Sequence, residues 1–469
     1  MESQPRHPLK LDEHHRRSPE ATAMSGLRFS WAAYRKASAD LLASAPLESC
    51  GVAYSIHDPH TDSWLVDNVE TVADSAYEHR DEVSATLRPA FIVEVANRAR
   101  ALGRSVVLVH THPFEQRHPR FSTVDDRGEI ALADYLRRRA PKSEHLALVL
   151  SQAGCRARRI GTVQEVPVWQ VGERLVLMSS EKSTEGGHAR YDRQVRAFGA
   201  DGQRAISSLK VGVVGVGGTG SVLLQQLIRL GVRDFVLIDP DVVETTNLNR
   251  LAGAGPTDVG ATKIAVAERE ILACSPGSWV RGLRADVVDA NIATELVGLD
   301  FVFLCTDSHA SRAVVCQIAY QYLVPTIDMG TSITVREGAV THVTGRVQML
   351  APELPCLTCT GALDGNQIRR EMMSPERRAS DPYLLGDYEP QPAVMSINTT
   401  MASLAATMFM ATVTSMPSQA RFQLYDGIRG AVRPTQARRV EDCIVCSPRG
   451  ALAKGSSWPL PVRPSENNG

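Results

Sequence analysis

A glycine-rich turn constrains the fold of this chain more than any other feature. The sequence Gly215-Val-Gly-Gly-Thr-Gly220 follows an apolar run at 211–214 and leads into a helical pattern at 221–230. Another apolar run at 235–239 completes the order strand, helix, strand, which indicates a parallel, doubly wound sheet. Glycines at such a turn let the backbone approach phosphate groups at the start of the helix, so a nucleotide is the expected ligand.

Charged residues around this turn distinguish two nucleotide chemistries. The glycine pattern, with Asp239 about twenty residues further on, also fits a dinucleotide whose ribose hydroxyls Asp239 would hold, and alone it favours NAD. Arg193, Arg250 and Lys263 favour ATP. Attack of a carboxylate on the α-phosphate builds negative charge on phosphoryl oxygens and on departing pyrophosphate, which these cations can neutralise. Asp307, just after a later apolar run, can hold Mg²⁺.

These motifs resemble the superfamily of ThiF, MoeB and the ubiquitin-activating enzymes over residues 190–450. The resemblance implies a Rossmann-like adenylation domain that uses ATP and Mg²⁺, with Arg193, Arg250 and Lys263 as catalytic residues. It also implies a homodimer, because the equivalent of Arg193 reaches the partner protomer's site. The expected cofactor-binding residues are Gly215, Gly217, Gly218, Gly220, Asp239, Asp241, Asn247, Arg250, Lys263 and Asp307.

Two Cys-x-x-Cys pairs in the same unit predict a second kind of site. Four thiolates suit a closed, tetrahedral structural zinc that joins two segments far apart in the sequence and contributes to folding. Redox-active thiols are the alternative. Nine cysteines in a chain with no recognisable export signal indicate a reducing, cytoplasmic setting and not a disulfide framework. The predicted ligands are Cys356, Cys359, Cys443 and Cys446.

The stretch between the two pairs contains no cysteine, although ubiquitin-activating enzymes pass their carrier to a catalytic cysteine. Cys305 and Cys316 are expected to be buried, and Cys274 stays open as a candidate. A thioester on this protein is therefore not expected. Residues 361–393 have the composition of the crossover loop of the superfamily.

Polar residues near the N-terminus predict a metal site of a different type. The apolar run 106–109 is typical of a buried strand and ends at His110-Thr111-His112, where two imidazoles on one side of the chain can share an ion. Asp125 can supply a third ligand. Three protein ligands leave one position open for water, as in catalytic zinc sites, and zinc lowers the pKa of that water towards about 7.

Hydrolysis at such a site also needs a proton carrier and an oxyanion donor. Glu48 can pass the proton from the water to the leaving amine, and Ser122 can donate a hydrogen bond to the oxyanion. With Pro113, these residues resemble the JAB/MPN metalloprotease family (the JAMM motif) over most of residues 26–165. The resemblance implies Glu48 as the acid/base, Ser122 as the oxyanion donor, and zinc bound by His110, His112 and Asp125.

Two features depart from that family pattern. The loop 114–121 carries an extra charged stretch, and Phe121 stands where a proline often precedes the serine. Neither removes a catalytic group. A JAB-like domain without catalysis is the alternative interpretation.

The predicted organisation is α/β throughout. An N-terminal JAB/MPN-type α/β domain is followed by a linker and by the adenylation domain with its structural zinc, and both ends are expected to be disordered tails. The apolar segment 401–416 carries several Ser and Thr residues and predicts a buried amphipathic helix, not a membrane span. The predicted bounds are 1–25 for the first tail, 26–165, 166–189 for the linker, 190–450, and 451–469 for the second tail.

The two constellations together predict a bifunctional enzyme of ubiquitin-like protein conjugation. It would adenylate the C-terminus of a β-grasp carrier and would trim that carrier or remove it from targets. The alternative is a sulfur-carrier adenylyltransferase that forms a thiocarboxylate, with a fused carrier-processing protease. A conjugating enzyme or a sulfur donor is the expected further partner. A non-catalytic scaffold and an NAD oxidoreductase are weaker hypotheses. The net charge of −1 gives no electrostatic case for nucleic acid or membrane partners.

Overall fold

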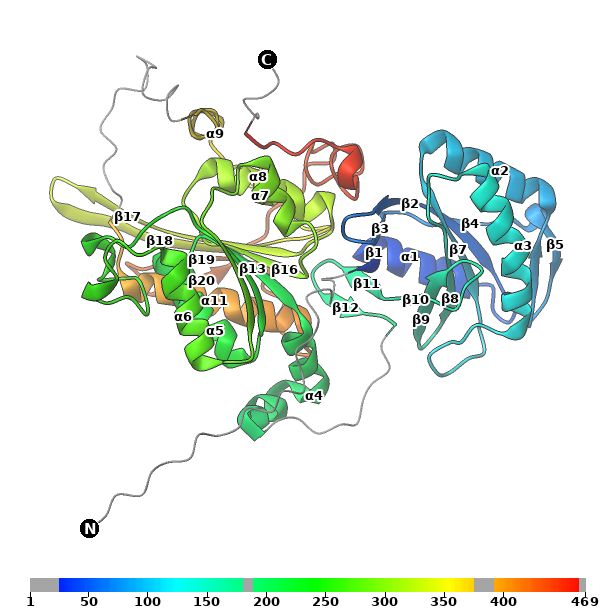
Figure 1. The fold of residues 1–469 in the computed structure, drawn as a ribbon, viewed down its shortest axis with the longest axis horizontal. Helices are drawn as coiled ribbons and strands as arrows, with labels where there is room; N and C mark the ends of the chain where they lie inside the picture. The colour runs from blue at the N-terminus through cyan, green and yellow to red at the C-terminus, as the bar shows by residue number, and fades with distance from the viewer. Residues whose placement is uncertain (1–24, 180–188, 375–391, 464–469) are drawn as a thin grey trace, which may run out of the picture.

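The computed structural model describes residues 25–179, 189–374 and 392–463, which form two α/β units packed side by side (Figure 1). The predicted tail at 1–25, except for Ser25, lies outside the described residues. So do the end of the predicted linker and much of the predicted crossover loop.

The N-terminal unit contains a ten-stranded sheet. Its strand order is β10-β9-β8-β7-β2-β3-β1-β11-β12, and β4 pairs with β2. The strands are β1 (Gly26–Ser30), β2 (Cys50–Asp58), β3 (Ser63–Val66), β4 (Glu70–Thr71), β7 (Ser105–Thr111), β8 (Leu146–Ser151), β9 (Gly154–Arg159), β10 (Glu165–Val166), β11 (Val168–Val171) and β12 (Leu175–Leu177).

Helices cover both faces of this sheet. The helix α1 (Trp31–Leu42) packs on one face through Ala33, Ala37 and Leu41. On the other face lie α2 (Pro89–Leu102) and α3 (Thr123–Arg139). A small hairpin of β5 (Tyr77–Arg80) and β6 (Ala85–Leu87) completes the unit. The sheet therefore has an apolar core on each side. The C-terminal end of β7 lies on the side that α3 covers, close to the start of that helix.

The predicted linker at 166–189 is in part wrong. Residues 168–171 form β11, which pairs in parallel with β1 at the start of the unit, and 175–177 form β12. Val168 and Val171 are fully buried. These strands are only three or four residues long. Because β12 pairs with β11, and β11 pairs with a strand about 140 positions away, the local pattern did not reveal them.

The second unit confirms the predicted doubly wound sheet. Its order is β15-β14-β13-β16-β17-β18-β19-β20, parallel from β15 to β17 and antiparallel beyond. The strands are β13 (Lys210–Val214), β14 (Asp234–Ile238), β15 (Trp279–Leu283), β16 (Phe301–Leu304), β17 (Thr326–Arg336), β18 (Ala339–Leu350), β19 (Phe422–Asp426) and β20 (Ala431–Pro434).

Two helical layers enclose this sheet (Figure 1). One layer contains α5 (Gly218–Leu230), α6 (Lys263–Cys274) and α11 (Met395–Val413), and the other contains α7 (Ala290–Ala293) and α8 (His309–Gln321). The described part of this unit also contains α4 (Asp192–Ser208) and α9 (Gly365–Glu371). As expected, α11 is a buried helix, with Met401 and Phe409 fully enclosed. Within the described residues, no helix has the length and apolarity needed to cross a membrane.

The predicted disordered tail at 451–469 is wrong for residues 451–463. Leu452 and Ala453 are buried, and Gln321 of α8 donates to the carbonyl oxygens of Gly455 and Trp458, each at 2.7 Å. A Cβ added at Gly455 would lie 3.0 Å from Ile56 of β2, so this segment fits tightly between the two units. The Pro- and Ser-rich composition of this segment suggested disorder. The contacts that order it could not be predicted, because Gln321 and Ile56 are distant in the sequence.

Candidate nucleotide pocket and metal centres

An open pocket of about 830 Å³ lies at the carboxyl ends of the parallel strands β13, β14 and β16. Every residue predicted to bind the cofactor lines this pocket except Gly220. Gly220 is instead needed for packing, because a Cβ there would collide with the carbonyl oxygen of Gly215. The position is typical of nucleotide sites in open α/β sheets.

The glycine turn brings backbone to the pocket wall. Gly215 has φ +88°, and a Cβ there would lie 3.0 Å from the main chain of Cys305 and Thr306. A Cβ at Gly218 would lie 2.5 Å from Nδ2 of Asn398, a buried residue of α11 that also lines the pocket. Asn398 was not predicted from the sequence, because an isolated polar residue in a helical pattern carries no motif.

Asp239 is fixed at the end of β14. Its two oxygens accept from the backbone N–H groups of Val216 (2.8 Å) and Asp241 (2.9 Å). Burial raises the pKa of the Asp239 carboxyl above its usual range, and the nearby Lys263 ammonium partly offsets this effect. Lys263 itself forms an ion pair with Asp241 at 2.7 Å. The Asp239 carboxylate and the Lys263 ammonium therefore lie close together in the pocket, beside the glycine turn.

Of the other residues predicted for the adenylation site, two line the pocket and one does not. Arg250 lines the pocket and donates to the carbonyl oxygen of Thr246 at 2.6 Å. Asp307 also lines it, exposed just after β16. Arg193 is exposed on α4 and does not line the pocket of its own chain.

A buried carboxylate supports a further cation that the sequence analysis missed. Asp328 of β17 is fully buried and accepts from Nε of Arg312 at 3.1 Å and from Nη2 of Arg346 at 2.5 Å. Arg312 lines the nucleotide pocket. Its only sequence signal was a position in the first turns of a helical pattern, which gave no reason to assign it to the pocket.

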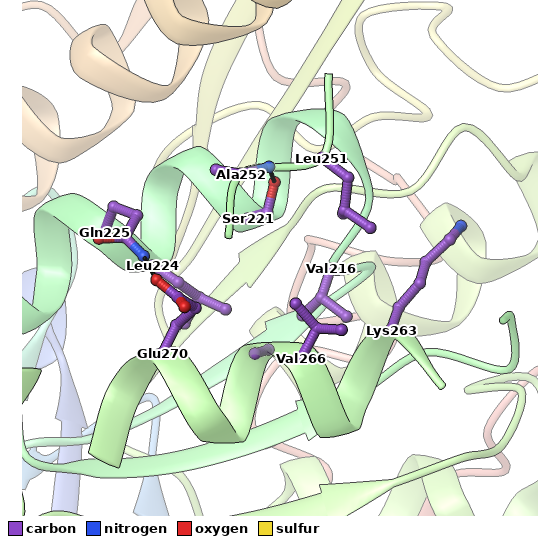
Figure 2. A pocket seen from close by; sticks show the side chains of 10 residues that line it. Val216, Ser221, Leu224, Gln225, Leu251, Ala252, Lys263, Val266 and Glu270 are labelled. Carbon is purple, nitrogen blue, oxygen red and sulfur yellow. Dashed lines mark hydrogen bonds between the residues drawn. The ribbon is translucent and has the colours of Figure 1, made fainter. Parts of the chain in front are cut away.

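A small cavity of about 10 Å³ lies between α5 and α6, behind the glycine turn (Figure 2). Such a volume holds about one water molecule and no ligand. The amide of Gln225 donates to Glu270 across it at 2.9 Å, and the hydroxyl of Ser221 accepts from the N–H of Ala252 at 3.0 Å. The first bond joins α5 to α6, and the second fastens the loop that carries Arg250 to α5.

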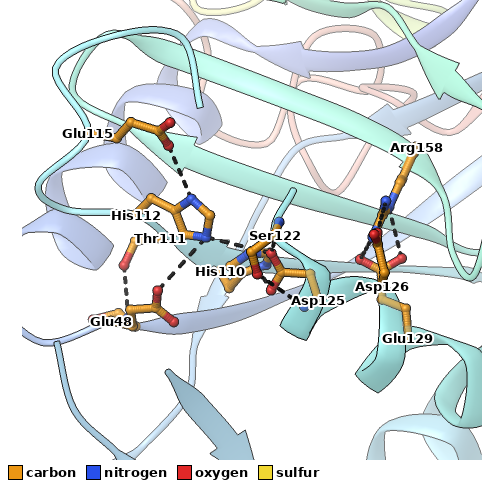
Figure 3. A network of polar contacts seen from close by, with 11 residues as sticks. Glu48, His110, Thr111, His112, Glu115, Ser122, Asp125, Asp126, Glu129 and Arg158 are labelled. Atoms are coloured by element: carbon orange, nitrogen blue, oxygen red, sulfur yellow. Dashed lines mark hydrogen bonds and ion pairs between the residues drawn. The ribbon is translucent and has the colours of Figure 1, made fainter. Parts of the chain in front are cut away.

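The predicted N-terminal metal ligands meet in space (Figure 3). His110 and His112 come from the end of β7, and Asp125 comes from the first turn of α3. One ligand atom from each lies within 4.8 Å of the others. Nε2 of His110 is buried without a hydrogen-bond partner of good geometry and lies 3.3 Å from Oδ1 of Asp125. An orphaned buried imidazole nitrogen beside a carboxylate fits a metal ion such as zinc.

The capping box at the start of α3 holds both Ser122 and Asp125 in place. Ser122 is the N-cap, and its hydroxyl oxygen accepts from the N–H of Asp125, while Oδ2 of Asp125 accepts from the N–H of Ser122. Burial alone would raise the pKa of Asp125, but the nearby His110 imidazole and the hydrogen bonding with Ser122 hold it well below its usual range. Asp125 is therefore an anion, as a metal ligand must be.

Glu48 lies beside these ligands, and its Oε1 is 3.8 Å from Nε2 of His112. Burial raises the pKa of its carboxyl to about 7; His110 opposes this shift and Asp125 adds to it. A carboxyl of that pKa can accept and return a proton near neutral pH.

The four cysteines of the two Cys-x-x-Cys pairs form one cluster. Neighbouring sulfurs are 3.5 to 3.6 Å apart. These separations are close to the ~3.8 Å edge of a tetrahedron with Zn–S bonds of about 2.3 Å. The predicted burial of Cys316 is confirmed. Cys305 is only partly buried and lines the nucleotide pocket, because it follows the last residue of β16.

Sheet topology and pocket together define a nucleotide-binding protein of the Rossmann-like α/β class. The model of the ThiF family matches residues 191–445, and the chain belongs to this family. It is 31% identical over 172 residues to the SAMP-activating enzyme E1 of Haloferax volcanii, covering 36% of this chain and 60% of that protein's length.

Other relatives also match part of the chain. Identity to the molybdopterin-synthase adenylyltransferase of Salmonella typhimurium is 26% over 263 residues, covering 55% of this chain and 95% of that protein. Identity to the ubiquitin-like modifier-activating enzyme 5 of Oryza sativa is 29% over 214 residues, covering 41% and 49%. A crystal structure of Escherichia coli MccB with ATP superposes with a TM-score of 0.44 at 20% identity, covering 56% of this chain and 76% of that one.

Proposed function

We propose that this protein adenylates the C-terminal carboxylate of a ubiquitin-like or sulfur-carrier protein at the second unit, and hydrolyses an amide bond of the same carrier at the N-terminal unit. The observation that carries the first activity is the convergence of Asp239, Arg250, Lys263 and Asp307 on one pocket. Membership of the ThiF family and the activities for which the relatives are named support it.

Adenylation follows from the positions of these groups. The ribose of ATP would lie against Asp239, and its phosphates would lie at the glycine turn, where the first N–H groups of α5 have no helical partner. The carrier's carboxylate attacks the α-phosphorus, and the bond to pyrophosphate breaks. Arg250 and Lys263 neutralise the charge on the departing pyrophosphate. Asp307 would hold Mg²⁺, which supplies further neutralisation of the phosphates.

Hydrolysis is proposed for the N-terminal centre on the donor set of two histidines and a carboxylate. The resemblance to the JAB/MPN metalloproteases supports it. A zinc ion there would supply an activated water at neutral pH. Glu48 takes the proton from that water and delivers it to the leaving amine, while Ser122 stabilises the oxyanion.

Two fates of the adenylate remain as candidates. The absence of cysteine between the two Cys-x-x-Cys pairs favours direct transfer to another protein or to a sulfur donor, without a thioester on this chain. Conjugation is the first candidate, and thiocarboxylate formation is the second. Exposure of Arg193 on α4, away from its own pocket, is compatible with a homodimer in which it serves the partner.

Intact mass spectrometry tests the proposal. The protein would be mixed with Mg-ATP and a glycine-ended β-grasp carrier, supplied both mature and with a C-terminal extension. We expect carrier-adenylate, pyrophosphate and removal of the extension. A thiol-sensitive adduct of carrier on this protein would show transthiolation and direct attention to Cys274. No pyrophosphate release with any carrier tried would contradict the adenylation proposal.

A further inference from the structure

The two ring nitrogens of His112 face different partners. Nε2 points into the candidate metal centre, 3.7 Å from Oδ2 of Asp125 and 3.8 Å from Oε1 of Glu48. Nδ1 points away from it and lies 3.1 Å from Oε2 of Glu115 (Figure 3). A carboxylate can only accept a hydrogen bond, so Nδ1 must carry the proton of the pair. Nε2 is then left with the lone pair that a metal requires.

Glu115 belongs to the loop 114–121, which departs from the JAB/MPN pattern in the sequence. The start of this loop is fixed, because the N–H of Glu115 donates to the carbonyl oxygen of His112 at 3.2 Å. Its middle is fixed against the β8–β9 turn, where the hydroxyl of Ser151 donates to the carbonyl oxygen of Arg117 at 3.2 Å. The loop is therefore attached to the same sheet that carries the ligands.

Two further contacts close the loop onto that sheet. The ring of His118 covers Gly154, where a Cβ would lie only 2.5 Å from the imidazole. The guanidinium of Arg158, itself buried and bonded to Glu129, lies 3.8 Å from the ring centroid of Phe121. With the loop held along its length, its backbone places Glu115 beside His112, and the Glu115 carboxylate lies against the ring of His112.

We propose that Glu115 is a positioning residue for the metal centre, holding His112 in the tautomer and ring orientation that direct Nε2 at the ion. The inference rests on the proposed function of this centre as a zinc site. Glu115 contacts neither the metal position nor a reacting group; it acts through His112. Carboxylates behind ligating histidines commonly fix the ring and strengthen the ligand, and their loss typically weakens metal binding 10- to 100-fold.

The test is zinc affinity of the full chain by chelator competition. Each chain should bind one very tight zinc at the four cysteines and a second at the N-terminal centre, which His110→Ala removes. Glu115→Ala should weaken the second zinc by roughly 10- to 100-fold. Glu115→Gln should lie between, because its amide oxygen still accepts the Nδ1 proton but without charge. Glu94→Gln, an exposed change on α2, is the matched control.

Co²⁺ substitution gives a readout that altered folding alone would not produce. The visible absorption of Co²⁺ at the N-terminal centre should shift in Glu115→Ala, while pyrophosphate exchange at the other unit stays at the unsubstituted level. Equal affinity and an unchanged Co²⁺ spectrum in Glu115→Ala would overturn the positioning role. If the unsubstituted protein and His110→Ala both bound a single zinc, the proposed hydrolytic centre itself would be wrong.

Discussion

Arg28, on the first strand of the N-terminal unit, donates from Nη1 to the carbonyl oxygen of Tyr322 at 2.8 Å. Tyr322 is the C-cap of α8, and Arg28 is only 1% exposed. A cation at this end of a helix meets its unsatisfied carbonyl groups and its negative dipole end. The opposite end of α8 carries Ser311 and Arg312 into the nucleotide pocket. One helix thus connects the neighbouring unit to the nucleotide site.

Arg28→Met should destabilise the whole molecule. The substitution keeps much of the apolar volume but leaves the Tyr322 carbonyl without its charged donor, at a cost of about 2–3 kcal/mol. The midpoint of urea unfolding should fall accordingly. Arg35→Met, an exposed change on α1, should have the same urea midpoint as the unsubstituted protein. If the midpoint of Arg28→Met were also unchanged, the contact between Arg28 and Tyr322 would not stabilise the packing of the two units.

Glu48→Gln should stop hydrolysis and leave adenylation intact. The amide cannot carry the proton, so cleavage of an extended carrier should fall about 10²- to 10⁴-fold. Pyrophosphate exchange reports the other activity, and Glu78→Gln on the nearby hairpin is the exposed control. Loss of both activities in Glu48→Gln would refute a model with two separate sites.

Arg250→Ala should have the opposite effect. Without this cation the charge on departing pyrophosphate is less well neutralised, so exchange should fall about 10²- to 10³-fold. Cleavage of the extended carrier should continue. Arg229→Ala, exposed near the end of α5, is the control. An unchanged exchange rate in Arg250→Ala would remove this arginine from the proposed machinery.

Cys446→Ser should abolish the tight zinc site. One of four ligands is lost, and metal binding that contributes to folding is lost with it. Elemental analysis should show one zinc fewer per chain, and the melting temperature should fall. Cys274→Ser, which lies outside the cluster, should keep its zinc and its stability. A Cys446→Ser protein with full zinc content would show that the cluster serves another purpose.

Glu353 should make stability depend on pH. Burial raises the pKa of its carboxyl to about 7, although the N–H of Ala32 donates to it and lowers the value. The folded protein therefore holds this proton more tightly than the unfolded chain. The associated stability is complete below about pH 4.5 and is lost as the pH rises through about 7.

Glu353→Gln removes this titration. Its melting temperature relative to the unsubstituted protein should therefore rise between pH 5 and pH 8, while Glu441→Gln, an exposed change, should track the unsubstituted protein throughout. Parallel curves for Glu353→Gln would show that the carboxyl is ionised at both pH values.

The groups that could be placed from the sequence are those whose chemistry is carried by a short stretch of the chain. The turn from Gly215 to Gly220 and the pair Ser122 and Asp125 are local motifs, since each depends on residues within six positions. Asp239 follows from the strand-helix-strand unit that carries the turn. Such groups could be assigned to sites before any tertiary contact was known.

What could not be predicted depends on contacts between distant residues. The strand β11 exists because β1 lies beside it, and Gln321 fixes the segment after residue 451. Arg312 enters the pocket because a buried Asp328 lies behind it, and nothing near either residue in the sequence pairs them. In the sequence, the loop 114–121 is only an extra charged stretch. Its attachment to the sheet could not be predicted, because Phe121 contacts Arg158 on a later strand.

The two units share buried surface, both around Gly455 and in the core of the second unit, so neither unit is expected to be stable when expressed alone. Leu65, Val171 and Leu175, all from the N-terminal unit, belong to the main apolar cluster of the second unit. A fragment that begins near residue 190 would expose the surface these side chains cover, and a fragment that ends near 180 would expose the side chains themselves. Recombinant halves should therefore aggregate, and dissection by point substitution in the intact chain is the informative route.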